Sequence, residues 1–81
     1  MIVKSSVYML LDKKLILKLF KDSVEYGIIC VQADNLGVTE DICKVSNISP
    51  NRRDVERIFT RIVKYKAFSC SICEIIEDMI C

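Results

Sequence analysis

The sequence predicts an α+β fold, in which a small antiparallel sheet of three or four strands is followed by two C-terminal helices packed on one face. Three observations predict it. Short runs of β-branched and aromatic residues fill the first half, residues 34–37 have the composition of a hairpin turn, and Ser49-Pro50 has the features of a helix start. The 81 residues suit one domain, which we divide into a β-rich part, 1–47, and a helical part, 49–81.

The composition excludes several classes of protein. Apolar residues make up 52% of the chain, which is too many for a disordered segment. The net charge of +1 exerts no general attraction on nucleic acid or on an anionic membrane, so binding of that kind requires a local basic patch. The N-terminus lacks the features of a signal peptide, and no apolar stretch approaches the roughly 20 residues that a bilayer requires. We therefore expect a cytoplasmic protein without a membrane partner.

Two apolar runs near the N-terminus predict a pair of strands. Val7–Leu11 and Leu15–Phe20 are separated by the polar Asp12-Lys13-Lys14, as in a hairpin with a short turn. A helix over 12–22 is the alternative, because apolar runs this short fit either period. The strand is favoured, since the polar break at Asp22-Ser23 would leave the helix shorter than usual.

The second of these runs is apolar on both faces. Leu15, Leu17 and Leu19 alternate with Ile16 and Phe20, and successive side chains of a strand point to opposite faces. Two helices cover only one face of a small sheet, so the other apolar face is left for a partner. We therefore predict a non-enzymatic binding or regulatory module that acts through protein–protein contact or homodimerisation.

Val24–Ala33 is the clearest strand, and Asp34–Gly37 closes it. Asp at the first position and Gly at the last are typical of a type I turn followed by a left-handed glycine bulge. A regular register from this turn places Cys30 opposite Ile42, so that Cys30 and Cys43 lie on opposite faces. A slip of one residue would place the two cysteines side by side.

The first of two amphipathic helices is expected after Ile48. Ser49 has the side chain of an N-cap, Pro50 suits the first helical position, and Asp54 falls in the first turn. The apolar face of this helix is expected to comprise Val55, Ile58, Phe59, Ile62 and Val63.

The second helix is expected to begin at Ser69 or at Ser71. Ser71 has Glu74 three residues later, which would complete a capping box, whereas Ser69 gives the longer helix. Its apolar face is expected to comprise Ile72, Ile75, Ile76 and Met79. Its polar face is expected to expose Glu74, Glu77 and Asp78.

The polar face of the first helix carries a basic stripe. Its members, spaced three or four residues apart, are Arg53, Arg57, Arg61 and Lys64. Basic helix faces bind phosphates, so a nucleic-acid-binding regulator is the main alternative function. The simpler interpretation is a solvated helix face whose charge is neutralised by the acidic second helix.

Five cysteines in a chain without an export signal predict reduced thiols rather than a disulfide framework. Cys70 and Cys73 have the Cys-x-x-Cys spacing of redox sites and of zinc knuckles, so a thiol redox or zinc site is a second alternative. Neither has its usual context, because no strand follows this helix, no second Cys-x-x-Cys pair is present and the chain contains no histidine. We therefore expect no metal and no cofactor.

Enzymatic activity is not expected. The absence of histidine removes the commonest general base. Glu77 and Asp78 are adjacent carboxylates, but neighbours on a helix point about 100° apart and do not converge. We assign no catalytic residues.

Four short segments carry a family resemblance. They are Tyr26-Gly27-Ile28 at a strand, Ile48-Ser49 before a helix, Val55-Glu56 early in that helix and Ile76-Glu77-Asp78 near the end. From Tyr26 to Met79 the chain resembles a family of small uncharacterised proteins from Gram-positive bacteria, known as a domain of unknown function. The resemblance implies a bacterial source and the same order of strands and helices, with no known activity, cofactor or partner. The chain departs from the family pattern at Cys70-Ser71-Ile72, where we expect Pro and a polar residue, so the resemblance implies no general role for the cysteine pair.

Overall fold

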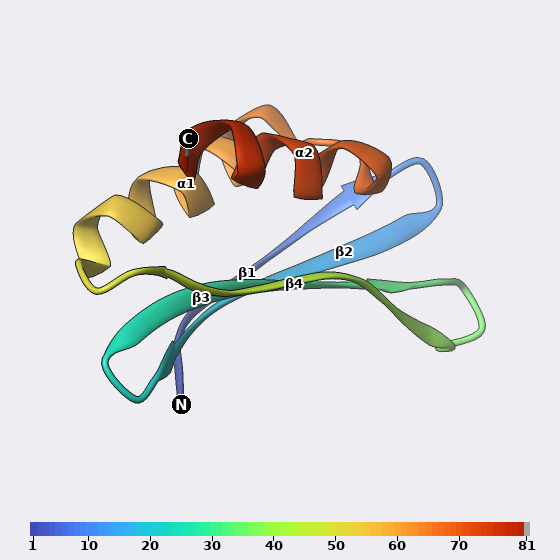
Figure 1. Cartoon of the computed structure of the whole chain (residues 1–81). Coiled ribbons are helices and arrows are strands. Elements are labelled where there is room, and N and C mark those ends of the chain that lie inside the picture. The colour runs from blue at the N-terminus through green and yellow to red at the C-terminus, as the bar shows by residue number, and fades with distance from the viewer. Residues whose placement is uncertain (81) are drawn as a thin grey trace.

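A computed structural model describes residues 1–80, with the side chains of all of them except residues 69, 70 and 80. The elements are β1 (Ile2–Leu10), β2 (Lys13–Asp22), β3 (Glu25–Ala33), β4 (Thr39–Ser49), α1 (Arg52–Tyr65) and α2 (Ser69–Ile80). The strands form one antiparallel sheet in the order β1-β2-β3-β4, and both helices lie over the same face of it (Figure 1). The predicted α+β fold is therefore confirmed.

The first three strands are joined by two tight turns. The strand prediction for the second apolar run is confirmed, because β2 pairs with β1 on one side and with β3 on the other. The chain reverses at Leu11 and at Ser23, whose φ angles are 58° and 55°. Two-residue hairpin turns require such positive φ values, which glycine or asparagine usually supplies. Neither residue belongs to those types, so the sequence gives no strong turn signal at either position.

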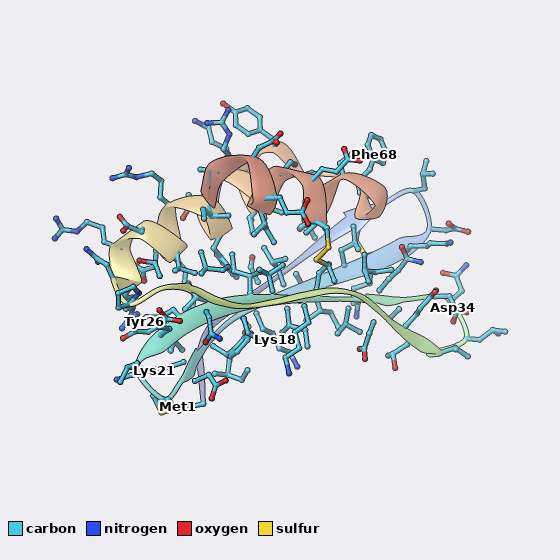
Figure 2. The ribbon with its side chains drawn as sticks, viewed as in Figure 1. Met1, Lys18, Lys21, Tyr26, Asp34 and Phe68 are labelled. Carbon is cyan, nitrogen blue, oxygen red and sulfur yellow. A yellow bond between two sulfur atoms is a disulfide. The ribbon has the colours of Figure 1, made fainter. Side chains whose placement is uncertain are left out.

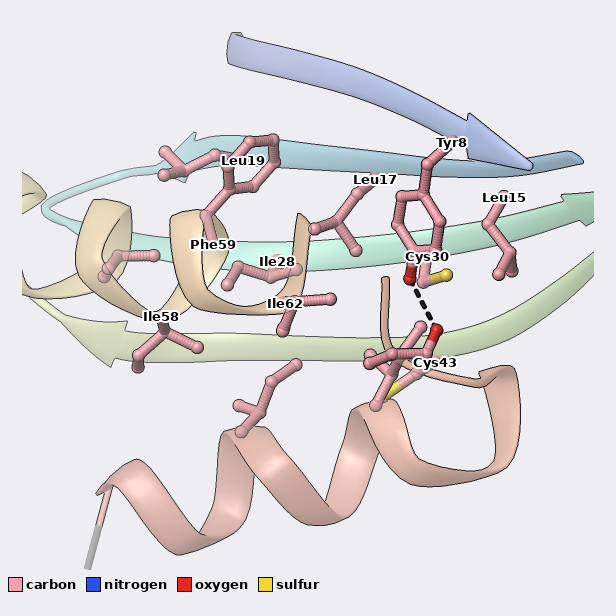
Figure 3. Packing of buried hydrophobic residues seen from close by; sticks show 14 residues of the cluster. Tyr8, Leu15, Leu17, Leu19, Ile28, Cys30, Cys43, Ile58, Phe59 and Ile62 are labelled. Carbon is pink, nitrogen blue, oxygen red and sulfur yellow. Dashed lines mark hydrogen bonds between the residues drawn. The ribbon is translucent and has the colours of Figure 1, made fainter. Parts of the chain in front are cut away.

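The core lies between the sheet and the two helices (Figure 3). Alternate residues of β2 are buried in it, namely Leu15, Leu17 and Leu19. α1 buries four of the five residues of its predicted apolar face, and the fifth, Val63, is half-buried against the core. α2 buries Ile72 and Ile76, while the acidic residues of its polar face are exposed as predicted. The spacing of apolar residues therefore predicted correctly which face of each helix is buried against the sheet.

The β3–β4 hairpin begins as predicted and then changes register. The Asp34 amide donates a hydrogen bond to the Val38 carbonyl, and the Asp34 carboxylate accepts hydrogen bonds from the amides of Leu36 and Val38. Gly37 has a φ of 82°, in the left-handed region. The register then shifts by one residue, because Ile42 is an extra residue on β4, and Cys30 pairs directly with Cys43. The prediction that these cysteines lie on opposite faces is wrong. The β-bulge turns the side chains that follow it, from Cys43 to Val45, to the faces opposite those of a regular register.

α1 begins later than the sequence indicated. Ser49 remains at the end of β4, and Asn51 is the N-cap, whose side-chain oxygen accepts a hydrogen bond of 2.9 Å from the Arg53 amide. The assignment of Ser49 as N-cap and Pro50 as first helical residue is therefore wrong by two positions. Ser49 instead accepts a hydrogen bond from the Asn51 amide, so its hydroxyl orders the turn that leads into the helix. Proline disfavours a helical conformation in the residue before it, which keeps Ser49 extended.

α2 begins at Ser69, the start that gives the longer predicted helix. Ser71 lies inside the first turn, where its amide donates a hydrogen bond to the Phe68 carbonyl, so the predicted capping box at Ser71 is wrong. The Ser69 side chain is outside the described part of the chain. None of the helices described here is both long and apolar enough to cross a membrane.

Candidate binding surfaces

One face of the sheet points away from the helices, and we call it the open sheet face. Lys18, Ile29 and Lys44 form its middle row across β2, β3 and β4. Figure 2 shows Lys18 on the side of the sheet opposite the helices. The open sheet face is defined by six apolar residues, Val7, Met9, Ile16, Phe20, Ile29 and Val31, and by three lysines, Lys14, Lys18 and Lys44.

The apolar residues of the open sheet face are separate from the core. None of the six belongs to the buried cluster or to the half-buried side chains that pack against it. Val7 and Met9 are 53% and 52% exposed, and the other four are half-buried by their neighbours within the sheet. The prediction that β2 is apolar on both faces is therefore confirmed, and no described element covers the second face.

Phe20 lies in the row next to the middle row, toward the β2–β3 turn. It pairs with Gly27 on β3, and a Cβ atom at Gly27 would lie 2.6 Å from Cζ of the Phe20 ring. The ammonium group of Lys44 is 5.7 Å from the centroid of the same ring, a cation–π contact. Gly27 therefore lets an aromatic side chain of β2 reach over β3 toward β4, which gives the face a fixed aromatic side chain.

The charge of the open sheet face is uneven. Its lysines lie in the two rows on either side of the apolar row Val7-Ile16-Val31, and that row ends in an acidic side chain, Asp41, at the edge strand beside the bulge. Two further carboxylates, Asp22 and Glu25, pair with each other at the β2–β3 turn, beyond Phe20. The centre of the face therefore combines apolar surface with positive charge.

A second surface follows α1, and we call it the basic groove. It is a groove of about 450 Å³ between the polar face of α1 and the edge strand β1. Its cations are Lys4, Arg53, Arg57, Arg61 and Lys64. The structure brings together all four predicted members of the basic stripe, each of them exposed, and adds Lys4 from the other layer.

The positive charge of the basic groove is not neutralised by α2. Glu56 is the acidic residue of the groove, and its carboxylate lies 3.0 Å from the Arg52 guanidinium in an i,i+4 pair. Within the part of the chain described, no ion pair joins the stripe to the acidic residues of α2. The interpretation in which the second helix neutralises the stripe is therefore not supported by contacts in this fold.

Tyr65 closes the C-terminal end of the basic groove. Tyr65 is 67% exposed, and the Arg61 guanidinium and the Lys64 ammonium group lie 5.9 Å and 5.6 Å from the centroid of its ring. Sequence reasoning overlooked both Tyr65 and Lys4. Tyr65 could have been identified from the sequence, because it directly follows Lys64 of the basic stripe. Lys4 could not, because it lies almost 50 positions before the stripe and only the fold brings it there.

The cysteines differ from the expectation of reduced thiols. Cys43 and Cys73 form a disulfide with a Cα–Cα distance of 6.0 Å, which joins β4 to α2, so in this structure the pair is oxidised and not reduced as expected. The bulge at Ile42 is the cause, because it turns Cys43 toward the helices. Cys30 is a buried free thiol opposite Cys43, and burial raises its pKa to about 11.

The disulfide also bears on the redox and zinc hypotheses for Cys70 and Cys73. Both hypotheses require the Cys73 thiol, which is bonded to Cys43 here. The Cys70 side chain and Cys81 lie outside the described residues. Among the side chains that the structure does describe, no group of three metal-ligating residues is present.

Comparison with known families shows to which family the chain belongs. A family of unknown function, DUF6514, has a model that matches residues 4–81. The chain belongs to DUF6514. No curated protein and no solved structure was found to match this DUF6514 member. Its functional assignment therefore depends on the geometry of its own surfaces.

Proposed function

We propose that this DUF6514 member is a non-enzymatic protein-binding module, and that the open sheet face is its binding surface. The observation that carries the proposal is an apolar sheet face that no element of the described residues 1–80 covers. Sheets in globular proteins bury their apolar faces against helices or other sheets. Here α1 and α2 cover one face only (Figure 1), so the second face is available to a partner.

The apolar residues supply enough surface for a moderate affinity. Complete burial of a Val or Met side chain contributes about 1.5–3 kcal/mol, so covering the half-exposed Val7 and Met9 contributes about 1 kcal/mol each. Phe20 adds a large aromatic ring that Gly27 and Lys44 already hold in place. Such preorganisation lowers the entropy that a side chain loses on binding.

The lysines define the chemistry of the partner. We assign the face to an amphipathic segment whose apolar stripe is flanked by carboxylates, since Lys14, Lys18 and Lys44 surround the apolar centre. A second copy of the chain fits less well. Two such faces centred on each other would bring Lys18 and Lys44 of both copies into one layer, and like charges oppose association.

Two designed peptides test the assignment directly. Both are helical and carry the same apolar stripe, but the stripe is flanked by Glu in one peptide and by Lys in the other. In NMR titrations of the ¹⁵N-labelled protein, we expect the acidic peptide to shift amides of β2 and β3 and the basic peptide to shift none. No shift with either peptide, or shifts confined to α1, would overturn the proposal.

Two double variants with equal changes of charge separate the surfaces. Lys14→Glu plus Lys18→Glu is expected to weaken binding of the acidic peptide by about tenfold or more. Arg57→Glu plus Arg61→Glu, on the opposite layer, is expected to leave it unchanged. Sedimentation of the wild type is expected to show a monomer. A dimer that Lys18→Glu strengthens would assign the face to a second copy instead.

The proposal places the protein in the cytoplasm of a Gram-positive bacterium, where disulfides are rarely kept. The Cys43–Cys73 bond is then expected to be open in the cell, with the fold maintained by the core. Alkylation of thiols at the moment of lysis, followed by mass spectrometry, measures this. A fully oxidised pair would contradict the cytoplasmic location.

A further inference from the structure

The basic groove combines two features that occur together in proteins that bind single-stranded nucleic acid. Its cations come from two separate elements, since Lys4 belongs to β1 and the arginines belong to α1. An exposed aromatic ring, Tyr65, stands at its end. A basic groove contacts the phosphate backbone, and an exposed aromatic ring stacks with a base.

The spacing along α1 suits a nucleic-acid strand. From Arg53 to Lys64 the helix rises about 16 Å, at about 1.5 Å per residue. A stacked strand advances about 3.4 Å per nucleotide, so this length matches about five phosphates. The groove supplies five cations along this length, counting Lys4.

The electrostatic state of the groove favours an external anion. Glu56 is engaged by Arg52, and the acidic residues of α2 form no ion pair with the stripe among the described residues. Arginines four residues apart on a helix repel one another, so an unoccupied stripe is slightly destabilising. A phosphate backbone removes this repulsion.

Tyr65 distinguishes a nucleic-acid strand from other polyanions. The Arg61 and Lys64 cations lie 5.9 Å and 5.6 Å from the centroid of its ring, and the residue is still 67% exposed to solvent. A lipid headgroup offers phosphate but no flat ring to stack there, and the bases of a duplex are already stacked on each other. An unpaired base satisfies both the cations and the ring.

We propose that the basic groove binds single-stranded nucleic acid, with phosphates at Lys4, Arg53, Arg57, Arg61 and Lys64 and one base stacked on Tyr65. The site is independent of the open sheet face, which lies on the other side of the sheet. Each surface can therefore fail its test without affecting the test of the other.

Fluorescence anisotropy with a labelled oligouridylate of about 12 nucleotides tests the proposal, since single-strand sites span about 4–16 nucleotides per domain. Binding is expected to weaken with salt, with a slope of log affinity against log salt of about −3.5 for five phosphate contacts. Duplex DNA of equal length and vesicles of anionic phosphatidylglycerol are expected to bind more weakly at the same salt. Equal or tighter binding of the duplex or the vesicles would overturn the proposal, as would no binding at low salt.

Variants assign the roles of the residues. Arg57→Glu plus Arg61→Glu is expected to lower affinity by about tenfold or more and to flatten the salt slope. The matched control, Lys14→Glu plus Lys18→Glu, changes the net charge equally and is expected to have little effect. An equal loss in both would show general electrostatic attraction and overturn the assignment to the groove.

The stacking contact has its own readout. Tyr65→Ala is expected to lower affinity by about 5- to 100-fold without changing the salt slope, whereas Tyr65→Phe retains it. Thermal unfolding by circular dichroism checks that each variant is folded. Unchanged affinity in Tyr65→Ala would leave a polyanion surface without base contact, and the assignment to single strands would be wrong.

Discussion

The hydroxyl of Tyr8 donates a hydrogen bond of 2.7 Å to the carbonyl oxygen of Ala67, 59 residues later in the chain (Figure 3). Tyr8 belongs to the edge strand β1, and Ala67 lies in the connection between α1 and α2. Both residues are buried, with 6% and 9% of their surface exposed. This single bond therefore ties the first strand to the turn that sets α2 over the sheet.

Replacement of Tyr8 by Phe is expected to lower the free energy of unfolding by about 1–3 kcal/mol. The ring stays, but the buried Ala67 carbonyl loses its partner, and an unsatisfied buried acceptor costs about that much. Denaturant unfolding measures the loss. Tyr65→Phe is the control, because that ring is exposed and its change should stay within about 0.5 kcal/mol. Equal effects of the two variants would contradict the role assigned to the Tyr8 hydroxyl.

Stability is expected to fall at alkaline pH. Burial, and secondarily the charge of Cys30, raises the pKa of Tyr8 from 10.0 to about 12, and burial raises the pKa of Cys30 from 9.0 to about 11. Both folded-state values exceed the unfolded ones, so the unfolded chain loses these protons first as pH rises. The stability that both groups contribute is complete below pH 9.0 and is lost as pH rises through about 11 and 12.

Urea unfolding across this pH range measures the effect. Tyr8→Phe and Cys30→Ala each remove one titrating group, so each is expected to flatten the fall in stability. The double variant is expected to flatten it further. A fall of the same steepness in wild type and double variant would show that other groups cause it.

Features that depend on local spacing were open to prediction from the sequence. The apolar face of α1 follows from residues three and four apart, and the turn at Asp34 follows from two residue types at fixed positions. The open sheet face was also predictable, since β2 alternates between two apolar sets. In each case, residues close in sequence determine the structure.

Features that depend on distant contacts were not predictable. The extra residue at Ile42 is favoured because it turns Cys43 toward the core, and the sequence near β4 does not reveal that the core requires it. The disulfide to Cys73 also depends on this bulge, whereas the expectation of reduced thiols rested on the lack of an export signal and on no contact between cysteines. Lys4 joins the basic groove only because β1 lies beside α1.

Reduction of the Cys43–Cys73 disulfide is expected to destabilise the protein by about 3–4 kcal/mol. The bond closes a loop with a sequence separation of 30 residues. Opening this loop increases the conformational entropy of the unfolded chain, which lowers the free energy of unfolding by about that amount. Unfolding with and without reductant measures the difference. Cys43→Ala plus Cys73→Ala should not respond to reductant. Equal stability of the wild type under both conditions would contradict a stabilising bond.

The shifted start of α1 gives a prediction at its cap. Asn51→Ala removes the side-chain oxygen that accepts from the Arg53 amide, and loss of an N-cap costs about 1 kcal/mol. The original assignment of the cap to Ser49 predicts the larger loss in Ser49→Ala instead. Thermal unfolding of the two single variants therefore distinguishes the two helix starts, and a larger loss at Ser49 would favour the earlier one.

Gly27→Ala is expected to destabilise the sheet by about 1–3 kcal/mol, the usual cost of overpacking. Alanine would place its Cβ 2.5 Å from the Val45 carbonyl oxygen and 2.6 Å from the Phe20 ring, so both neighbours must move. Phe20→Leu in the same chain is expected to recover part of the loss, because it relieves one contact and leaves the backbone contact with Val45. Gly37→Ala is a control with backbone strain alone, since its φ is 82° and nothing lies within 4 Å. If Phe20→Leu recovers nothing in Gly27→Ala, the ring of Phe20 does not lie over Gly27, and the open sheet face lacks a fixed aromatic side chain.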